Sequence, residues 1–208
     1  MAIHPVGIKN TFGSHLVLWA LFLPLLAIIF LPLVLPEQNI EVAEVEMVKS
    51  FDVDVSQLTA SASATFTKVF IDSGLMPRSE RFFSGAGDPT AKASSVFAAK
   101  WIHGVWMMVY KAIWRFYVLI RIFFMPLIAL SIPAAIDGFC IRSRKRYQFL
   151  NSNPVFFYSS MHLVVLMVGL FIFLPLAPFT LSATVLCIML LGTAGGMWLT
   201  AANFQTGS

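Results

Sequence analysis

Long apolar runs dominate the chain and predict helices that cross a membrane. Residues 15–35, 155–176 and 181–202 are each apolar over 21 or 22 positions. At a rise of 1.5 Å per residue, each run covers about the 30 Å hydrocarbon core of a bilayer. A further run, residues 122–136, is free of charge for only fifteen positions. Its span must therefore begin near Ile113 or earlier and include Arg115 and Arg121.

The segment 37–100 is the only sizeable polar part of the chain, and its apolar residues recur mainly at steps of three and four. This spacing favours an amphipathic helix, and the residues that carry it are Ile40, Val45, Val48, Phe51, Val55, Leu58, Ala62, Phe66 and Val69. Phe51, Val53 and Val55 also alternate, so a short strand stays an alternative there.

The second span belongs to a long helix, because no strong helix stop occurs between residues 89 and 138. We predict that this helix extends beyond the membrane and ends at Asp137 and Gly138. Aromatic residues along its first part are typical of the headgroup level of a bilayer: Trp101, Trp106, Tyr110, Trp114 and Tyr117.

The predicted fold is an all-α integral membrane protein with four transmembrane helices and a mainly helical periplasmic segment. The expected division is a cytoplasmic tail and first span (1–36), the periplasmic segment (37–100), the long amphipathic helix with the second span (101–138), a basic cytoplasmic loop (139–154) and a hairpin of the last two spans (155–208).

Composition supports this class. Hydrophobic residues make up 58% of the 208 residues, charged residues only 12%, and the mean hydropathy is +0.82. A soluble domain carries about 25% charged residues. The composition therefore excludes a soluble enzyme and a disordered protein.

The distribution of charge predicts the orientation of the chain. Residues 37–100 hold nine acidic and six basic residues, whereas the rest of the chain holds eight basic residues and a single acid. Lys and Arg concentrate on the cytoplasmic side of membrane proteins, so both termini are expected on the cytoplasmic side of the membrane. The strongest cluster is Arg142, Arg144, Lys145 and Arg146.

This basic cluster has two interpretations that the sequence leaves open. It can orient the protein by binding anionic lipid headgroups, or it can bind an acidic cytoplasmic partner. Direct contact with nucleic acid is not expected, because four charges without interleaved aromatic residues make a poor nucleic-acid site.

Ionisable residues inside the predicted spans are candidates for function, because a charge at bilayer depth is costly unless it is paired or hydrated. Arg115 and Arg121 either extend towards lipid headgroups or face a partner helix or a hydrated pocket. His162 either bonds to a neighbouring helix or serves as a ligand or proton relay. Asp137 at a helix end opposes the helix dipole, so Arg142 or Arg121 is its expected partner.

Small residues mark one face of the last span, where Gly192, Gly196 and Thr200 follow at four-residue intervals. This pattern permits close approach of two helices, either within one chain or between subunits of a homo-oligomer. Cys140 and Cys187 are expected at opposite faces of the bilayer as free thiols. No catalytic, cofactor-binding or metal-binding spacing is present, and no second histidine in the same leaflet is expected to form a metal pair with His162, since His15 lies at the edge of the first span.

A resemblance rests on Trp114-Arg115-Phe116-Tyr117, Arg121, Ile136-Asp137-Gly138-Phe139, Arg142, Phe157-Tyr158 and His162. Together with the N-terminal anchor, these residues resemble a bacterial inner-membrane family encoded by conjugative plasmids and integrative conjugative elements, one branch of which is called TraJ-type. The resemblance implies a non-enzymatic component of a type IV secretion-like DNA-transfer apparatus that docks or assembles the coupling ATPase. The alternatives are a subunit of a transporter or channel and a surface-exclusion or signalling protein.

Overall fold

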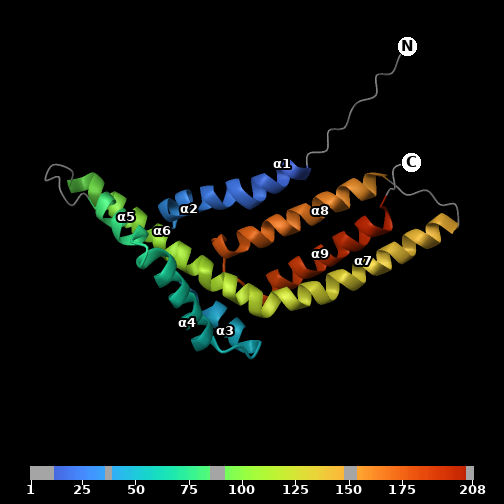
Figure 1. Ribbon diagram of the computed structural model, residues 1–208, viewed down its shortest axis with the longest axis horizontal. Coiled ribbons are helices and arrows are strands. Elements are labelled where there is room, and N and C mark those ends of the chain that lie inside the picture. The colour runs from blue at the N-terminus through green and yellow to red at the C-terminus, as the bar shows by residue number, and fades with distance from the viewer. Residues whose placement is uncertain (1–11, 36–38, 85–91, 148–153, 205–208) are drawn as a thin grey trace, which may run out of the picture.

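The computed structural model describes residues 12–35, 39–84, 92–147 and 154–204, and every regular element within these ranges is a helix (Figure 1). This confirms the predicted all-α class. It also excludes the short strand around Phe51 to Val55, because Phe51 and Asp52 form a turn and Val55 begins a helix.

The first span consists of α1 (Phe12–Val17), the π-helical turn η1 (Leu18–Phe22) and α2 (Leu23–Val34), which follow one another without a break. Pro24 lacks the N–H that would bond to the carbonyl four residues earlier, and its ring would collide with that carbonyl. The wider turn immediately before Pro24 relieves this conflict, as π-turns commonly do within helices.

Three short helices follow the first span: α3 (Val42–Ser50), α4 (Val55–Phe66, continued by the π-turn η2, Thr67–Ile71) and α5 (Leu75–Phe83). We call residues 39–84 the arm. Asp54 caps α4, since its side chain accepts hydrogen bonds from the backbone N–H groups of Ser56 and Gln57. Gly74, at φ +76°, provides the left-handed residue between η2 and α5.

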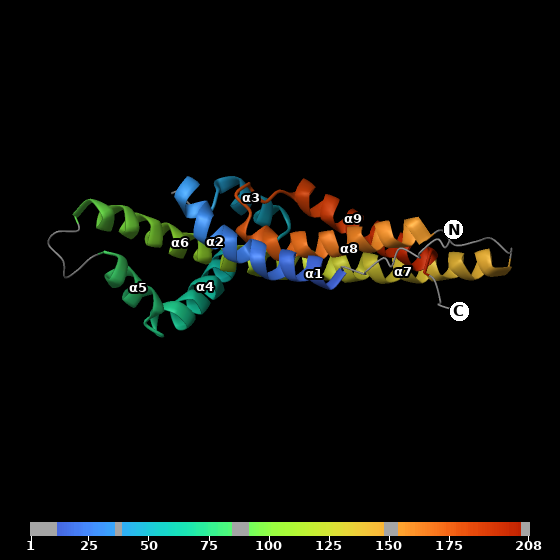
Figure 2. The same cartoon turned by 90° about the horizontal axis from the view of Figure 1, so that it is seen from above.

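The long helix comprises α6 (Lys92–Val118), the π-turn η3 (Leu119–Phe123) and α7 (Phe124–Tyr147). It continues through the expected domain boundary at residue 101 and is roughly 80 Å long at 1.5 Å per residue. Figures 1 and 2 show α4 and α5 of the arm beside α6, and α9 beside α7.

The predicted end of this helix at Asp137 and Gly138 is wrong. α7 continues to Tyr147, so much of the expected basic loop 139–154 is helical. A Cβ on Gly138 would lie 2.5 Å from the carbonyl oxygen of Trp198. Gly138 therefore allows another helix to cross closely, and it does not terminate its own helix.

The last two spans are α8 (Pro154–Phe173, with the 3-10 turn η4, Leu174–Leu176) and α9 (Ala183–Ala202). α9 packs against both α7 and α8, while α1 and η1 pack against α8 and α2 packs against α6. Within the described ranges, four segments are long and apolar enough to cross a membrane: Gly13–Val34, Ser95–Lys145, Val155–Leu176 and Ala183–Ala202. The protein is thus a membrane protein with an arm at one end of a helical bundle.

Candidate functional site

Arg115 lies at the point where the arm, α6 and the turn between α8 and α9 meet. Its Nε donates to Oε2 of Glu44 at 3.1 Å, and its Nη2 donates to Oε1 of the same carboxylate. Nη1 donates to the carbonyl of Ala177 at 2.5 Å, and Nη2 also donates to that of Phe179 at 2.7 Å. Arg115 is 1% exposed and Glu44 is fully buried. Arg115 thus bonds within the protein and does not extend towards lipid.

The turn between α8 and α9 contributes a donor as well. The N–H of Leu181 donates to Oε1 of Glu44 at 3.0 Å, and the Thr180 hydroxyl donates to Oε2 of Glu41 at 2.5 Å. Lys111 is buried one turn before Arg115 and lies in the electrostatic field of Arg115, Glu44 and Glu41. We call Glu44, Arg115, Lys111 and residues 177–181 the Glu44–Arg115 cluster.

The Glu44–Arg115 cluster holds the arm to α6 and to the α8–α9 turn, and we call this contact the joint. Breaking a buried ion pair by removing one partner typically costs 3–5 kcal/mol, because the other charge is left uncompensated. The pair connects α3, α6 and the α8–α9 turn, which are far apart in sequence. Sequence reasoning missed it because Glu44 lies outside the spans, where an exposed carboxylate is the ordinary expectation.

Aromatic side chains of α6 bond to hydroxyl groups of the arm. The Tyr110 and Tyr117 hydroxyls bond to those of Ser63 and Thr65 at 3.0 and 2.7 Å. Indole N–H groups donate in the same way, Trp106 to Ser79 at 2.9 Å and Trp114 to Thr59 at 3.1 Å. The expected headgroup location of these rings is therefore wrong for Trp114, which is 1% exposed.

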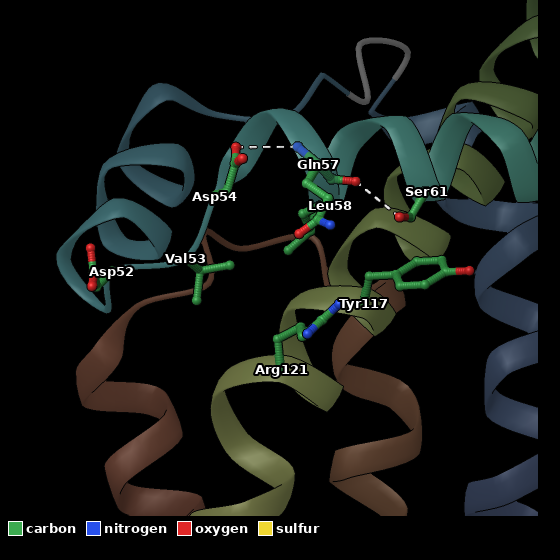
Figure 3. A pocket seen from close by; sticks show the side chains of 8 residues that line it. All are labelled: Asp52, Val53, Asp54, Gln57, Leu58, Ser61, Tyr117 and Arg121. Carbon is green, nitrogen blue, oxygen red and sulfur yellow. Dashed lines mark hydrogen bonds between the residues drawn. The ribbon is translucent and has the colours of Figure 1, made fainter.

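Arg121 lies apart from this cluster, in a cleft of about 380 Å³ between the α3–α4 turn and the long helix. We call it the Arg121 cleft; its lining residues are Asp52, Val53, Asp54, Gln57, Leu58, Ser61, Tyr117 and Arg121. Figure 3 shows Arg121 on the long helix below the first turn of α4, with Asp52 and Asp54 on the α3–α4 connection. Arg121 is exposed and forms no hydrogen bond or ion pair with another described residue.

Asp54 gives this cleft a fixed negative charge. Hydrogen bonds from the Ser56 hydroxyl and from the backbone N–H groups of Gln57 and Ser56 hold the pKa of the Asp54 carboxyl below its ordinary value of 3.8. Asp54 is consequently ionised at neutral pH, and the cleft contains charges of both signs.

The cations near the end of α7 have different surroundings. We call Arg142, Arg144, Lys145 and Arg146 the basic end. Lys145 donates to the Ala202 carbonyl at 3.5 Å and to Asn203 Oδ1 at 3.3 Å, and the Arg142 guanidinium lies 5.2 Å from the Phe204 ring centre. Arg144 is exposed, and the Arg146 side chain lies outside the described residues.

Asp137 and His162 also have partners on neighbouring helices. Asp137 Oδ2 accepts a hydrogen bond from the Trp198 indole N–H at 2.7 Å, so the expected arginine partner is wrong. Nδ1 of His162 lies 3.4 Å from Nδ1 of His15, so the first and third spans bring these two rings together. Among the described residues, no group of three or more His, Cys, Asp or Glu could hold a metal ion.

The small residues of α9 face α8. A Cβ on Gly192 would lie 3.0 Å from Met167 Sδ, and one on Gly196 would lie 3.0 Å from Val164 Cγ2. The Thr200 hydroxyl donates to the Ser160 hydroxyl at 3.0 Å. All three positions therefore contribute to packing within the chain. Cys140 and Cys187 are free thiols and are exposed.

Comparison with protein-family models gives a match over residues 37–205, to the family described as "IncC plasmid conjugative DNA transfer protein DtrJ-like". The chain belongs to the DtrJ-like family. The match extends from just before the arm through α9 and so includes the Glu44–Arg115 cluster, the Arg121 cleft and the basic end. Searches of curated proteins and of solved structures find no match.

Proposed function

We propose that this DtrJ-like protein is a non-enzymatic inner-membrane component of a type IV secretion-like transfer apparatus, and that its basic end docks the coupling ATPase. The family's association with conjugative DNA transfer supports a role in this transfer. The observation that carries the docking role is the set of cations at the end of α7, remote from the arm (Figure 1).

The same charges support an orientation with both termini in the cytoplasm. The basic end follows directly after an apolar span, where Lys and Arg have the strongest effect on topology. A cytoplasmic ATPase would then meet the basic end, while the arm would lie in the periplasm.

The geometry of the basic end suits a docking surface. Lys145 and Arg142 contact the end of α9 and the residues after it, so the cations are held at a junction of two helices. Arg144 is exposed, so its side chain is accessible to a partner. Each cation contributes about 1 kcal/mol near an anionic surface, and this attraction weakens as salt screens it.

The experiment replaces Arg144, Lys145 and Arg146 with Gln in a donor cell that carries the complete transfer system. A loss of about 3 kcal/mol corresponds to roughly hundredfold weaker binding. We expect the variant to insert normally, to lose the coupling ATPase on purification in mild detergent, and to transfer DNA at least about tenfold less often.

The matched control replaces three exposed lysines of the arm and α6, Lys49, Lys68 and Lys100, with Gln. This control should retain the ATPase and the parental transfer frequency. Retention of the ATPase by the basic-end variant at parental yield would contradict the docking role.

Orientation is tested separately by cysteine labelling, with Cys140 and Cys187 replaced by Ser. Single cysteines are introduced as Ala60→Cys in the arm and Ser143→Cys at the basic end, both at exposed positions. A membrane-impermeant maleimide added to spheroplasts should label the first and spare the second. The reverse pattern would overturn the orientation.

A further inference from the structure

His15 and His162 bring two imidazole rings together between the first and the third span. His15 lies in the first turn of α1, and His162 lies in α8. α1 and η1 pack against α8, and Figure 1 shows α1 alongside it. The rings meet although 147 residues separate them in the chain, so their contact depends on the packing of these two spans.

The arrangement of the two rings is not that of an ordinary hydrogen bond. The Nδ1 atoms of His15 and His162 are 3.4 Å apart, whereas N–H donors normally lie about 2.7–3.2 Å from their acceptors. Two nitrogens that pointed straight at each other across 3.4 Å would place the ring centres about 5.6 Å apart, because each centre lies about 1.1 Å behind its nitrogen. The observed distance between the ring centres is only 5.1 Å.

Both distances fit two imidazole ligands of one tetrahedral metal ion. Zn–N bonds are about 2.0–2.1 Å long, so two nitrogens on a tetrahedral ion lie about 3.3–3.4 Å apart. The ring centres behind those nitrogens are then about 5.1 Å apart. The nitrogen separation of 3.4 Å and the ring-centre separation of 5.1 Å thus match this geometry together.

We propose that His15 and His162 form a binding site for a Zn²⁺ ion, with Nδ1 of each ring as a ligand. Neutral imidazole is a common ligand of this ion. The two histidines occupy two of its four positions, and water molecules occupy the others. The ion joins α1 to α8.

The position of the pair along its helices suits a hydrated ion. His15 is exposed at the start of the first span, and His162 is half-buried. The residues of α8 shortly before His162 include Tyr158, Ser159 and Ser160. Tyrosine is typical of the boundary between membrane and water, so water reaches the ion, and a hydrated charge avoids the cost of transfer into hydrocarbon.

A metal link between α1 and α8 acts where few other contacts hold the chain. Only 11% of the apolar window of the first span is buried, against 33% for the last span. A ligand that binds only the packed state stabilises that state by mass action. Zn²⁺ should therefore slow amide hydrogen exchange in the first span and leave the exchange of the arm unchanged.

The test titrates the purified full-length protein, without a histidine tag, with Zn²⁺ in competition with a chromophoric indicator. Cys140 and Cys187 are replaced by Ser throughout, which removes both thiols as competing ligands. We expect His15→Gln and His162→Gln to bind Zn²⁺ at least about tenfold more weakly than the parent. His103→Gln, a change of an exposed histidine of α6, is the matched control and should bind like the parent.

A further variant separates loss of a ligand from loss of packing. His15→Cys exchanges one zinc ligand for another, and the longer Zn–S bond, about 2.3 Å, offsets the shorter side chain. This variant should therefore bind Zn²⁺ far better than His15→Gln does. With Co²⁺ in place of Zn²⁺, it should also show the charge-transfer absorption of a cobalt–thiolate bond.

Three results would overturn the proposal. The first is Zn²⁺ binding by the parent that is no tighter than that of His15→Gln. The second is a loss for His103→Gln that equals the loss for His15→Gln. The third is a His15→Cys variant that has the parental circular dichroism spectrum but binds Zn²⁺ no better than His15→Gln, which would leave the two rings a packing contact alone.

Discussion

The joint between the arm and α6 and the packing among α7, α8 and α9 hold the same long helix by different means. At the joint, Arg115 of α6 forms a buried ion pair with Glu44, and aromatic side chains of α6 bond to hydroxyl groups of the arm. Along α7 and α9, glycines allow close contact: a Cβ on Gly138 would meet the α9 backbone, and one on Gly196 would lie 3.0 Å from Val164 Cγ2 of α8.

This difference follows from the surroundings of each region. Lipid tails are as apolar as leucine side chains, so helices within a bilayer associate through close packing of small residues. Polar groups buried at the joint need partners, and Arg115, Trp114 and Tyr117 find theirs across the contact between arm and helix, in side chains of α3 and α4. The transition between the two regimes lies near η3, where the π-turn precedes Pro126.

The largest expected effect is at the joint. Glu44→Ala should lower the free energy of unfolding by about 3–5 kcal/mol, because Arg115 would remain buried without its counter-charge. Unfolding in sodium dodecyl sulfate, followed by circular dichroism, measures this change. Glu44→Gln combined with Arg115→Gln should be less harmful than either single change, and additive effects would contradict a coupled pair.

A smaller effect is expected in the bundle. Gly138→Ala should lower the free energy of unfolding by about 1–3 kcal/mol, because the new Cβ would collide with the Trp198 carbonyl. Gly195→Ala is the matched control, since a Cβ there meets nothing within 4 Å. The control should be neutral or slightly stabilising, and equal losses for both glycines would refute the close-packing explanation.

Smaller still is the contribution of a single hydroxyl contact. Tyr117→Phe removes only the oxygen that bonds to Thr65, and it should cost about 1 kcal/mol. A double-mutant cycle with Thr65→Val measures the coupling between the two side chains. A coupling free energy of zero would show that the hydroxyl contact does not join the arm to α6.

The smallest effect concerns the cap of α4. The depressed pKa of Asp54 stabilises the folded arm above the ordinary value of 3.8, and this stabilisation is lost as pH falls through the lower folded value. Asp54→Asn should therefore weaken the dependence of stability on pH below about pH 4. An unchanged pH profile would exclude Asp54 as a source of that dependence.

Sequence reasoning predicted the spans well from the long apolar runs, because length and apolarity alone determine whether a helix can cross a bilayer. It failed at Gly138, because a glycine in sequence does not reveal whether it ends a helix or admits a neighbour. It also failed at Glu44, His15 and Trp198, whose partners lie on helices distant in the chain. Contacts of this kind depend on how helices pack, which a single sequence does not specify.

The docking role is tested most directly by crosslinking in donor cells. A photoreactive benzoylphenylalanine replaces Ser143, an exposed residue that leaves all four cations of the basic end in place. A second derivative carries it at Lys68 in the arm, which is exposed as well. We predict a light-dependent crosslink to the coupling ATPase from position 143 and none from position 68. A crosslink from position 68 with none from position 143 would contradict docking at the basic end.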